Sequence, residues 1–158
     1  MHITFPGKRI LVAGAARGIG RAIAEAFAQR GAQVFASDLL ADEVARFAGP
    51  VAGGGAIQAL AADVTDPESV TAMVAQAGGE GGAIDGLIYV AGGVRGQSPH
   101  PVEEVEPEDW RAIVDANLTG AFLCARAVAP LMKQAGQGRI VIISSRSGLA
   151  TSLTGIQS

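Results

Sequence analysis

Residues 12–20 read Val12-Ala13-Gly14-Ala15-Ala16-Arg17-Gly18-Ile19-Gly20, a turn whose three glycines follow the spacing Gly-x-x-x-Gly-x-Gly. The apolar run before the turn, from Arg9 to Ala13, predicts a buried strand, and the residues after it repeat apolar side chains with a helical period. Glycines at such a junction let backbone N–H groups approach a phosphate closely, and the positive end of the helix favours the anion. The stretch therefore predicts a phosphate-binding turn with five candidate binding residues, Gly14, Arg17, Gly18, Ile19 and Gly20.

Strands and helices alternate along the rest of the chain. The predicted strands cover Arg9 to Ala13, Gln33 to Ser37, Ala56 to Ala61, Gly86 to Val90 and Arg139 to Ser144. The predicted helices cover Ile19 to Gln29, Ala41 to Phe47, Pro67 to Ala77 and Pro107 to Lys133. This alternation predicts an α/β fold, a doubly wound parallel sheet of the Rossmann type that forms a single domain over residues 1–158. The glycine-rich stretches Gly49 to Gly55 and Gly78 to Gly82 are predicted to be surface loops.

The composition indicates a globular protein without affinity for nucleic acid or membranes. Of the 158 residues, 49% are hydrophobic and 17% are charged, which allows a substantial core. The net charge of −3 offers no basic surface to nucleic acid or to an anionic membrane. The longest apolar stretch, Ala121 to Met132, is interrupted by Arg126 and Pro130, so no membrane span is predicted. No spacing of histidine, cysteine or carboxylate residues indicates a metal site.

The cysteine content and the N-terminus indicate the compartment. The single cysteine, Cys124, cannot form an internal disulfide, which is typical of a reducing environment, and we expect its side chain to be buried. Met1 to Gly7 lacks the charged and apolar regions of a signal peptide. We therefore expect a cytoplasmic protein.

Acidic residues follow the second and third predicted strands, at the edge where ligands of such sheets bind. Asp38 lies about twenty residues after the glycine turn, where a carboxylate accepts hydrogen bonds from the ribose of a dinucleotide. Its alternative role is a cap of the following helix. Asp63 also follows a strand, and its alternative role is a turn or cap near Thr65 and Asp66.

The choice of cofactor depends on Asp38 and Arg17. A carboxylate at position 38 repels the 2′-phosphate of NADP and accepts hydrogen bonds from the free 2′-hydroxyl of NAD, whereas Arg17 would neutralise the phosphate. Leu39 and Leu40 follow Asp38, where a second basic residue would favour NADP. NAD is therefore favoured over NADP.

Six landmarks carry a family resemblance. They are the glycine turn, Asp38, Asp63-Val64, Ala91-Gly92, Asn117-Leu118-Thr119-Gly120, and Ile143-Ser144-Ser145 with Gly148. In this order and spacing they resemble the short-chain dehydrogenase/reductase family, from Lys8 almost to the end of the chain. The resemblance implies an NAD-dependent oxidoreductase that interconverts a secondary alcohol and a ketone of small size, in a homodimer or homotetramer. The alternative is a non-catalytic dinucleotide-binding fragment or module.

The resemblance also implies roles for cofactor-binding residues. Asp63 would bind the adenine amino group, with the Val64 backbone beside it. Ala91 and Gly92 would line the cofactor at the end of the fourth predicted strand.

The catalytic candidates are Asn117 and Ser145. By resemblance, Asn117 would support a distorted helical turn and a proton relay, and Ser145 would hydrogen-bond the substrate oxygen. Their alternatives are a structural asparagine and a loop serine. Arg95 and Arg146 follow the fourth and fifth predicted strands and predict a polar or anionic substrate, unless both are solvated loop arginines.

Three features depart from the family pattern. The Tyr-x-x-x-Lys motif that supplies the family's acid/base does not occur in the 158 residues, and Tyr89, the single tyrosine, is predicted to be buried in a strand. We therefore expect an N-terminal portion of a longer polypeptide, which lacks the last strands of the sheet and is inactive alone. Ala13 stands where a threonine is usual, and Tyr89-Val90 stands where the family has two asparagines.

Two apolar stripes mark the long helix predicted from Pro107. The first faces the core and contains Trp110, Ile113, Val114, Asn117, Ala121, Cys124, Val128 and Leu131, with Asn117 as its polar member. The second predicts a contact with another subunit or, alternatively, with a helix of the same chain; it contains Leu118, Phe122, Ala125, Ala129 and Met132. Pro130 is predicted to kink or end the helix.

Overall fold

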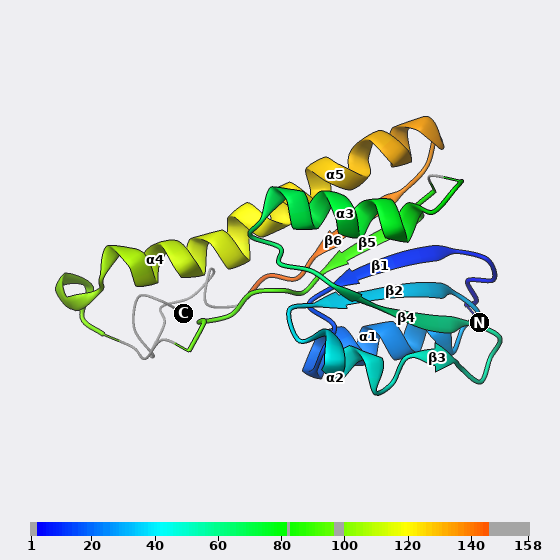
Figure 1. The fold of residues 1–158 in the computed structure, drawn as a ribbon, viewed down its shortest axis with the longest axis horizontal. Helices are drawn as coiled ribbons and strands as arrows, with labels where there is room; N and C mark the ends of the chain where they lie inside the picture. The colour runs from blue at the N-terminus through cyan, green and yellow to red at the C-terminus, as the bar shows by residue number, and fades with distance from the viewer. Residues whose placement is uncertain (1–2, 82, 97–99, 146–158) are drawn as a thin grey trace.

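The computed structural model describes residues 3–81, 83–96 and 100–145. Its centre is a six-stranded sheet in the order β3-β4-β2-β1-β5-β6 (Figure 1). Every neighbouring pair is parallel except β3 and β4. The strands are β1 Arg9–Ala13, β2 Gln33–Asp38, β3 Gly49–Pro50, β4 Ala56–Ala61, β5 Gly86–Tyr89 and β6 Arg139–Ile142.

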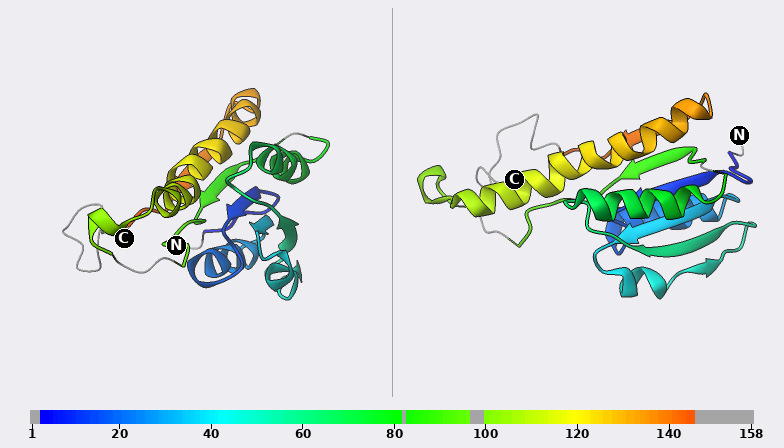
Figure 2. Two further views of the ribbon diagram at one scale, coloured as in Figure 1. Left: turned by 60° about the vertical axis from the view of Figure 1, so that its left-hand side comes forward. Right: turned by 45° about the horizontal axis from the view of Figure 1, so that its top comes forward.

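Helices cover both faces of this sheet. They are α1 Gly18–Ala28, α2 Ala41–Ala45, α3 Pro67–Gly78, α4 Pro107–Val114 and α5 Gly120–Gln134, with a short 3₁₀ turn at Val102–Glu104 and a π-turn at Asp115–Thr119. Helices α3 and α5 lie over one face, and α1 and α2 lie over the other (Figures 1 and 2). The predicted doubly wound α/β fold is therefore confirmed.

The alternation of side chains along β1 explains why it is buried on both faces. Leu11 and Ala13 enter the core beneath α3 and α5, whereas Ile10 and Val12 enter the core beneath α1 and α2. Because both faces of a doubly wound sheet are covered, a central strand needs an apolar residue at every position. The run that predicted the strand is thus explained by the two layers of helices.

The predicted helix from Pro107 to Lys133 is present as the continuous helical run Pro107–Gln134, which contains a π-turn. A π-turn at Asp115–Thr119 separates α4 from α5 and inserts one extra residue into the helical repeat. Pro130 does not end α5, which continues to Gln134; its ring lies on the exposed side of the helix, where the missing N–H is tolerated. The combined run Pro107–Gln134 is long and apolar enough to cross a membrane, a property that core helices share, and α5 packs here on α3 and β5.

Two smaller differences concern strand ends. Part of the glycine-rich stretch predicted as a loop forms the edge strand β3, because Gly49 and Pro50 pair with β4. The fifth predicted strand ends at Ile142 and not at Ser144.

The order of the strands creates the place for a site. After β4 the chain crosses to the other side of β1 and forms β5, so β1 lies between β2 and β5. Connections therefore leave the carboxyl ends of β1 and β5 in opposite directions, which opens a crevice at this edge of the sheet.

Candidate functional site

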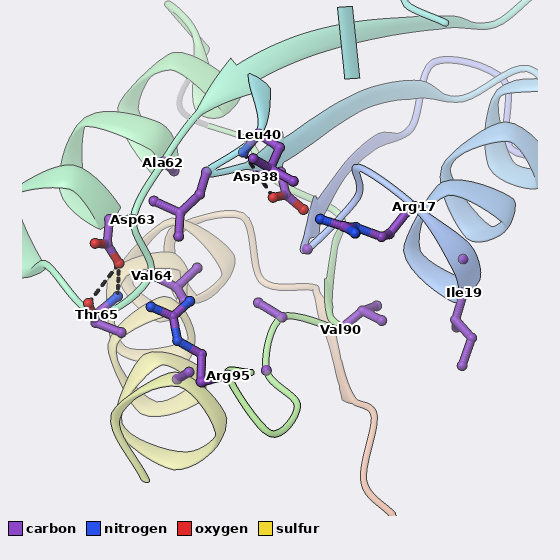
Figure 3. Close-up of a pocket in the computed structure, with 16 residues that line it drawn as sticks. Arg17, Ile19, Asp38, Leu40, Ala62, Asp63, Val64, Thr65, Val90 and Arg95 are labelled. Carbon is purple, nitrogen blue, oxygen red and sulfur yellow. Dashed lines mark hydrogen bonds between the residues drawn. The ribbon is translucent and has the colours of Figure 1, made fainter. Parts of the chain in front are cut away.

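A pocket of about 610 Å³ lies at the carboxyl ends of β1, β2, β4 and β5 (Figure 3). Each of these strands contributes the residues that directly follow it. Nine of the ten predicted cofactor-binding residues line the pocket, namely Gly14, Arg17, Gly18, Ile19, Asp38, Asp63, Val64, Ala91 and Gly92. The structure thus brings together residues from four separate stretches of sequence.

The glycine turn follows β1 with a geometry that requires glycine. Gly14 has a φ of 89°, and its N–H and that of Ala15 both donate to the Ser37 carbonyl, at 2.9 and 3.0 Å. A Cβ at Gly14 would lie 2.6 Å from Ala91 Cα, so a side chain would push β1 away from β5. The turn therefore brings its backbone close to the loop after β5.

Gly20, the tenth candidate, does not line the pocket. It is buried in the first turn of α1, where a Cβ would overlap the Gly14 carbonyl oxygen. Because Gly20 has no side chain, α1 packs closely against Gly14, and Gly20 supports the glycine turn without lining the pocket.

Asp38 connects the end of β2 to two loops. Its Oδ2 accepts a hydrogen bond from the Ala16 N–H and its Oδ1 accepts one from the Leu40 N–H, both at 3.0 Å. The alternative role as a helix cap is not the observed one, because Leu40 is the N-cap of α2. Each carboxylate oxygen has a second lone pair, so the carboxylate can still accept hydrogen bonds from a ligand in the pocket.

Asp63 stabilises the turn after β4. Its Oδ1 accepts hydrogen bonds from the Thr65 hydroxyl at 2.7 Å and from the Thr65 N–H at 2.9 Å. These two bonds, and the positive charge of Arg95, hold the pKa of Asp63 below its ordinary value. The cap of α3 is Asp66, which accepts from the Glu68 N–H at 3.0 Å. Asp63 therefore has the turn role that was its alternative, while its side chain still faces the pocket (Figure 3).

Two arginines flank the pocket from opposite walls. Arg17 precedes α1 and its guanidinium points toward Asp38, whereas Arg95 extends on the side of Val64 and Thr65 (Figure 3). Arg95 has a φ of 52°, a backbone conformation that non-glycine residues adopt infrequently. Arg146, the other arginine predicted near the substrate, lies outside the described residues.

Asn117 is the candidate whose surroundings differ most from the prediction. It was expected among core residues, but its side chain is exposed. The π-turn changes the phase of the helical repeat, so the apolar positions of α4 and α5 do not form one continuous stripe. Trp110 at the start of the predicted stripe is also exposed, because α4 extends beyond the sheet (Figure 1).

The Asn117 amide nevertheless makes three hydrogen bonds with the backbone. Its Nδ2 donates to the Gly93 carbonyl at 2.9 Å and to the Ile113 carbonyl at 2.8 Å, and its Oδ1 accepts from the Gly93 N–H at 3.0 Å. These bonds connect the π-turn to the loop after β5. The expected distortion of the helix around Asn117 is present as the π-turn itself.

Ser145, the second catalytic candidate, is exposed three residues after β6 ends. Neither Ser145 nor Asn117 lines the pocket, although Ala116 does. The structure therefore assembles the predicted cofactor residues into one site and leaves the two catalytic candidates beside it.

Further residues line the pocket that the motifs did not identify. Leu39, Leu40, Ala62, Thr65, Val90 and Ala116 complete its wall. Leu39, Ala62 and Val90 directly follow β2, β4 and β5, and this position at the end of a predicted strand is a signal that the sequence offers. Two other predictions are confirmed: Tyr89 is buried in β5, and Cys124 is a buried thiol whose pKa is raised by burial to about 12.

Comparisons with known proteins identify a family and several relatives. A family model described as short chain dehydrogenase matches residues 8–156. The D-threitol dehydrogenase of Mycolicibacterium smegmatis is 42% identical over 142 residues, which cover 89% of this chain and 54% of that protein. The cis-4-hydroxycyclohexanecarboxylate dehydrogenase of Sinomonas cyclohexanicum is 39% identical over 150 residues, with coverages of 94% and 59%.

A solved structure shares the fold of this chain. The crystal structure of a 3-oxoacyl-[acyl-carrier protein] reductase from Brucella melitensis with bound NAD superposes with a TM-score of 0.87 at 37% identity, over 96% of this chain and 58% of that one. The chain thus spans between 54% and 59% of the length of these relatives.

Proposed function

The chain belongs to the short-chain dehydrogenase family, and from this premise we propose that the whole protein is an NAD-dependent oxidoreductase that interconverts a secondary alcohol and a ketone. The observation that carries the proposal is the pocket in which the glycine turn faces Asp38 and Asp63. Residues 1–158 belong to its dinucleotide-binding domain.

The residues of the pocket fit a dinucleotide. Gly18 lines the pocket with no atom within 4 Å of the position of a Cβ, so the turn leaves open space there, and backbone N–H groups at the start of α1 suit a pyrophosphate. Asp38 provides acceptors for ribose hydroxyls, and Asp63 and Val64 form the wall on the adenine side. The bound nicotinamide would supply the hydride acceptor or donor.

The preference for NAD rests on Asp38. A ribose 2′-phosphate beside this carboxylate would bring two negative charges together, and Leu39 and Leu40 offer no cation to balance them. Arg17 favours NADP, since it lines the same pocket and points toward Asp38 (Figure 3). The Asp38 carboxylate, at the end of β2, accepts two backbone hydrogen bonds, so its position is better defined than that of the Arg17 guanidinium.

Ser145 and Asn117 have the catalytic roles in this proposal. Ser145 hydrogen-bonds the substrate oxygen, and Asn117 supports the proton relay through the turn that it holds. Tyr89 cannot serve as the acid/base, because its hydroxyl is buried and donates to the Ala116 carbonyl. The substrate is a small alcohol or ketone, as the names of the two curated relatives suggest.

The quaternary structure and location follow from the same premise. Leu118 and Phe122 are 68% and 59% exposed, whereas Met132 of the same predicted stripe is buried within the chain. This exposed apolar surface supports a homodimer or homotetramer in which α5 contributes to the interface. We place the protein in the cytoplasm, on its single cysteine.

The proposal is tested on the whole protein with a matched pair of serine variants. Ser145→Ala is expected to lower kcat by at least about 100-fold with an unchanged Kd for NADH, because the lost bond acts on the reacting oxygen. Ser144→Ala, its neighbour, should change kcat by less than about threefold. D-threitol and cis-4-hydroxycyclohexanecarboxylate are the first substrates to assay. NADH binding without turnover of any secondary alcohol would instead support the non-catalytic module.

A further inference from the structure

The π-turn leaves one carbonyl group without its usual helical donor. The Gly120 N–H donates to the Asp115 carbonyl, five residues back, where an α-helix would direct it to Ala116, four residues back. The Tyr89 hydroxyl donates to the Ala116 carbonyl in its place. Tyr89 is only 1% exposed and ends β5, so a strand of the sheet supplies the donor that the helix lacks.

The space around this hydroxyl is closely filled. A Cβ at Gly120 would overlap the Tyr89 hydroxyl oxygen and would lie 3.0 Å from Val64 Cγ2. Burial raises the pKa of Tyr89 well above its ordinary value, so the hydroxyl keeps the proton that it donates to the Ala116 carbonyl. Tyr89 therefore fixes the distance between β5 and the π-turn beside the pocket residue Val64.

The π-turn in turn holds the wall of the pocket. Asn117, which follows Ala116, exchanges hydrogen bonds with both backbone groups of Gly93. A Cβ at Gly92 would lie 3.0 Å from Asn117 Cγ, so this loop and the amide are in direct contact. Both Ala116 and Gly92 line the pocket.

We infer that Tyr89 is a positioning residue: by holding the Ala116 carbonyl, it keeps Asn117 bonded to Gly93 and so fixes the loop that follows β5 in the dinucleotide pocket. Gly93 is only four residues beyond Tyr89 in the chain. The hydrogen bond from Tyr89 to Ala116 and those between Asn117 and Gly93 therefore join this short segment to the π-turn at both of its ends. The effect on the loop follows from the hydrogen bonds alone, and the effect on the dinucleotide rests on the proposed function.

The test compares Tyr89→Phe with Leu87→Val in the whole protein without cofactor. Both variants change a buried residue of β5, but only Tyr89→Phe removes the donor to Ala116. Hydrogen exchange is measured by mass spectrometry on peptides over residues 90–96 and 113–121. We expect about fivefold faster exchange in both peptides for Tyr89→Phe, and no such change for Leu87→Val.

Asn117→Ala extends this test. It should give the same fast exchange over residues 90–96, and adding Tyr89→Phe to it should cause no further change there, because both side chains act through one connection. Faster exchange over residues 90–96 in the double variant than in Asn117→Ala would overturn the inference. An exchange rate in Tyr89→Phe equal to that in Leu87→Val would overturn it as well. If Tyr89→Phe does not fold, proton NMR of the unmodified protein decides. A slowly exchanging Tyr89 hydroxyl proton supports the inference, and rapid exchange overturns it.

The dinucleotide part is measured separately by fluorescence titration with NADH. Tyr89→Phe should weaken NADH binding by about fivefold relative to Leu87→Val. Binding that is equal in the two variants would overturn this part. Absence of NADH binding in the unmodified protein would overturn the proposed function. The exchange results would still test the hydrogen bonds that connect Tyr89 to Ala116 and Asn117 to Gly93.

Discussion

The Asp38 carboxylate accepts a hydrogen bond from the Ala16 N–H at 3.0 Å, so the end of β2 directly supports the glycine turn that follows β1. The same carboxylate faces the pocket. One residue therefore combines a structural contact within the turn with the position expected for a ribose ligand. An experiment on Asp38 therefore has to distinguish the loss of the hydrogen bond to Ala16 from the loss of the contact with a ligand.

We predict that Asp38 determines the preference for NAD. Asp38→Ala in the whole protein should weaken NAD binding by about 1–3 kcal/mol, because charged hydrogen bonds are lost, and should improve NADP relative to NAD. Asp38→Asn is the control: it keeps an acceptor for the turn but removes the charge, so it should lose less stability and still shift the preference. Kd values for both cofactors measure the effect. An unmodified protein that already prefers NADP would show that Arg17 dominates.

The turn itself should be sensitive to a side chain at Gly14 and much less so at Gly18. A Cβ at Gly14 would lie 2.6 Å from Ala91 Cα, whereas nothing lies within 4 Å of a Cβ at Gly18. Both residues have positive φ, so the backbone strain is shared by the two variants. We expect Gly14→Ala to cost about 3 kcal/mol of unfolding free energy and Gly18→Ala about 1 kcal/mol, as measured by urea denaturation. Equal losses would contradict the close approach of β1 and β5.

Asp85 should make stability depend on pH. Its Oδ1 accepts from Lys8 Nζ at 2.7 Å and its Oδ2 from the Arg9 N–H at 2.9 Å. Burial opposes ionisation, but these bonds outweigh it and lower the pKa of Asp85 below its ordinary value of 3.8. A lowered folded-state pKa means that the stabilisation is present above the unfolded-state pKa and is lost as pH falls through the folded-state value.

Asp85→Asn tests this dependence. Lys8 is 44% exposed at its side chain, so we expect a modest loss of about 1 kcal/mol at pH 7. Urea denaturation at pH 7 and pH 3 should show the difference between the two proteins shrinking at the lower pH, because pH 3 lies below the ordinary pKa of 3.8 and the unfolded chain then binds a proton that the ionised folded form lacks. A difference that is the same at both values would rule out the ionised form as its source.

The exposed part of α5 should carry the subunit contact. Phe122→Asp places a charge in an apolar contact and should shift the whole protein toward smaller species, as measured by light scattering. Val102→Asp is a matched control, because Val102 is 62% exposed but lies in the 3₁₀ turn before α4. An unchanged mass for Phe122→Asp, with normal folding, would assign this surface to packing within the chain.

The sequence alone determined most of the sheet and of the pocket. The strands at Arg9–Ala13 and Ala56–Ala61 match the predicted ones at both ends, because an apolar run bounded by turn residues is a local pattern. The pocket residues were found for a related reason. In a parallel sheet the carboxyl ends of the strands lie at one edge, so residues such as Gly14, Asp38 and Asp63 meet once the strands are known.

The family resemblance implied a distorted turn at Asn117, but only the tertiary structure decided which hydrogen bonds hold this turn and what Tyr89 does. The helical period continued through Asp115–Thr119 in the sequence, but the Tyr89 hydroxyl and the Gly93 backbone bind this segment from outside the helix, and their bonds are made where the π-turn occurs. Such contacts join residues 24 to 27 positions apart, and no local pattern reports them. Side-chain periodicity therefore predicted the helix but placed Trp110 and Asn117 in the core, where they do not lie, because hydrogen bonds between distant segments fix where a helix departs from its regular form.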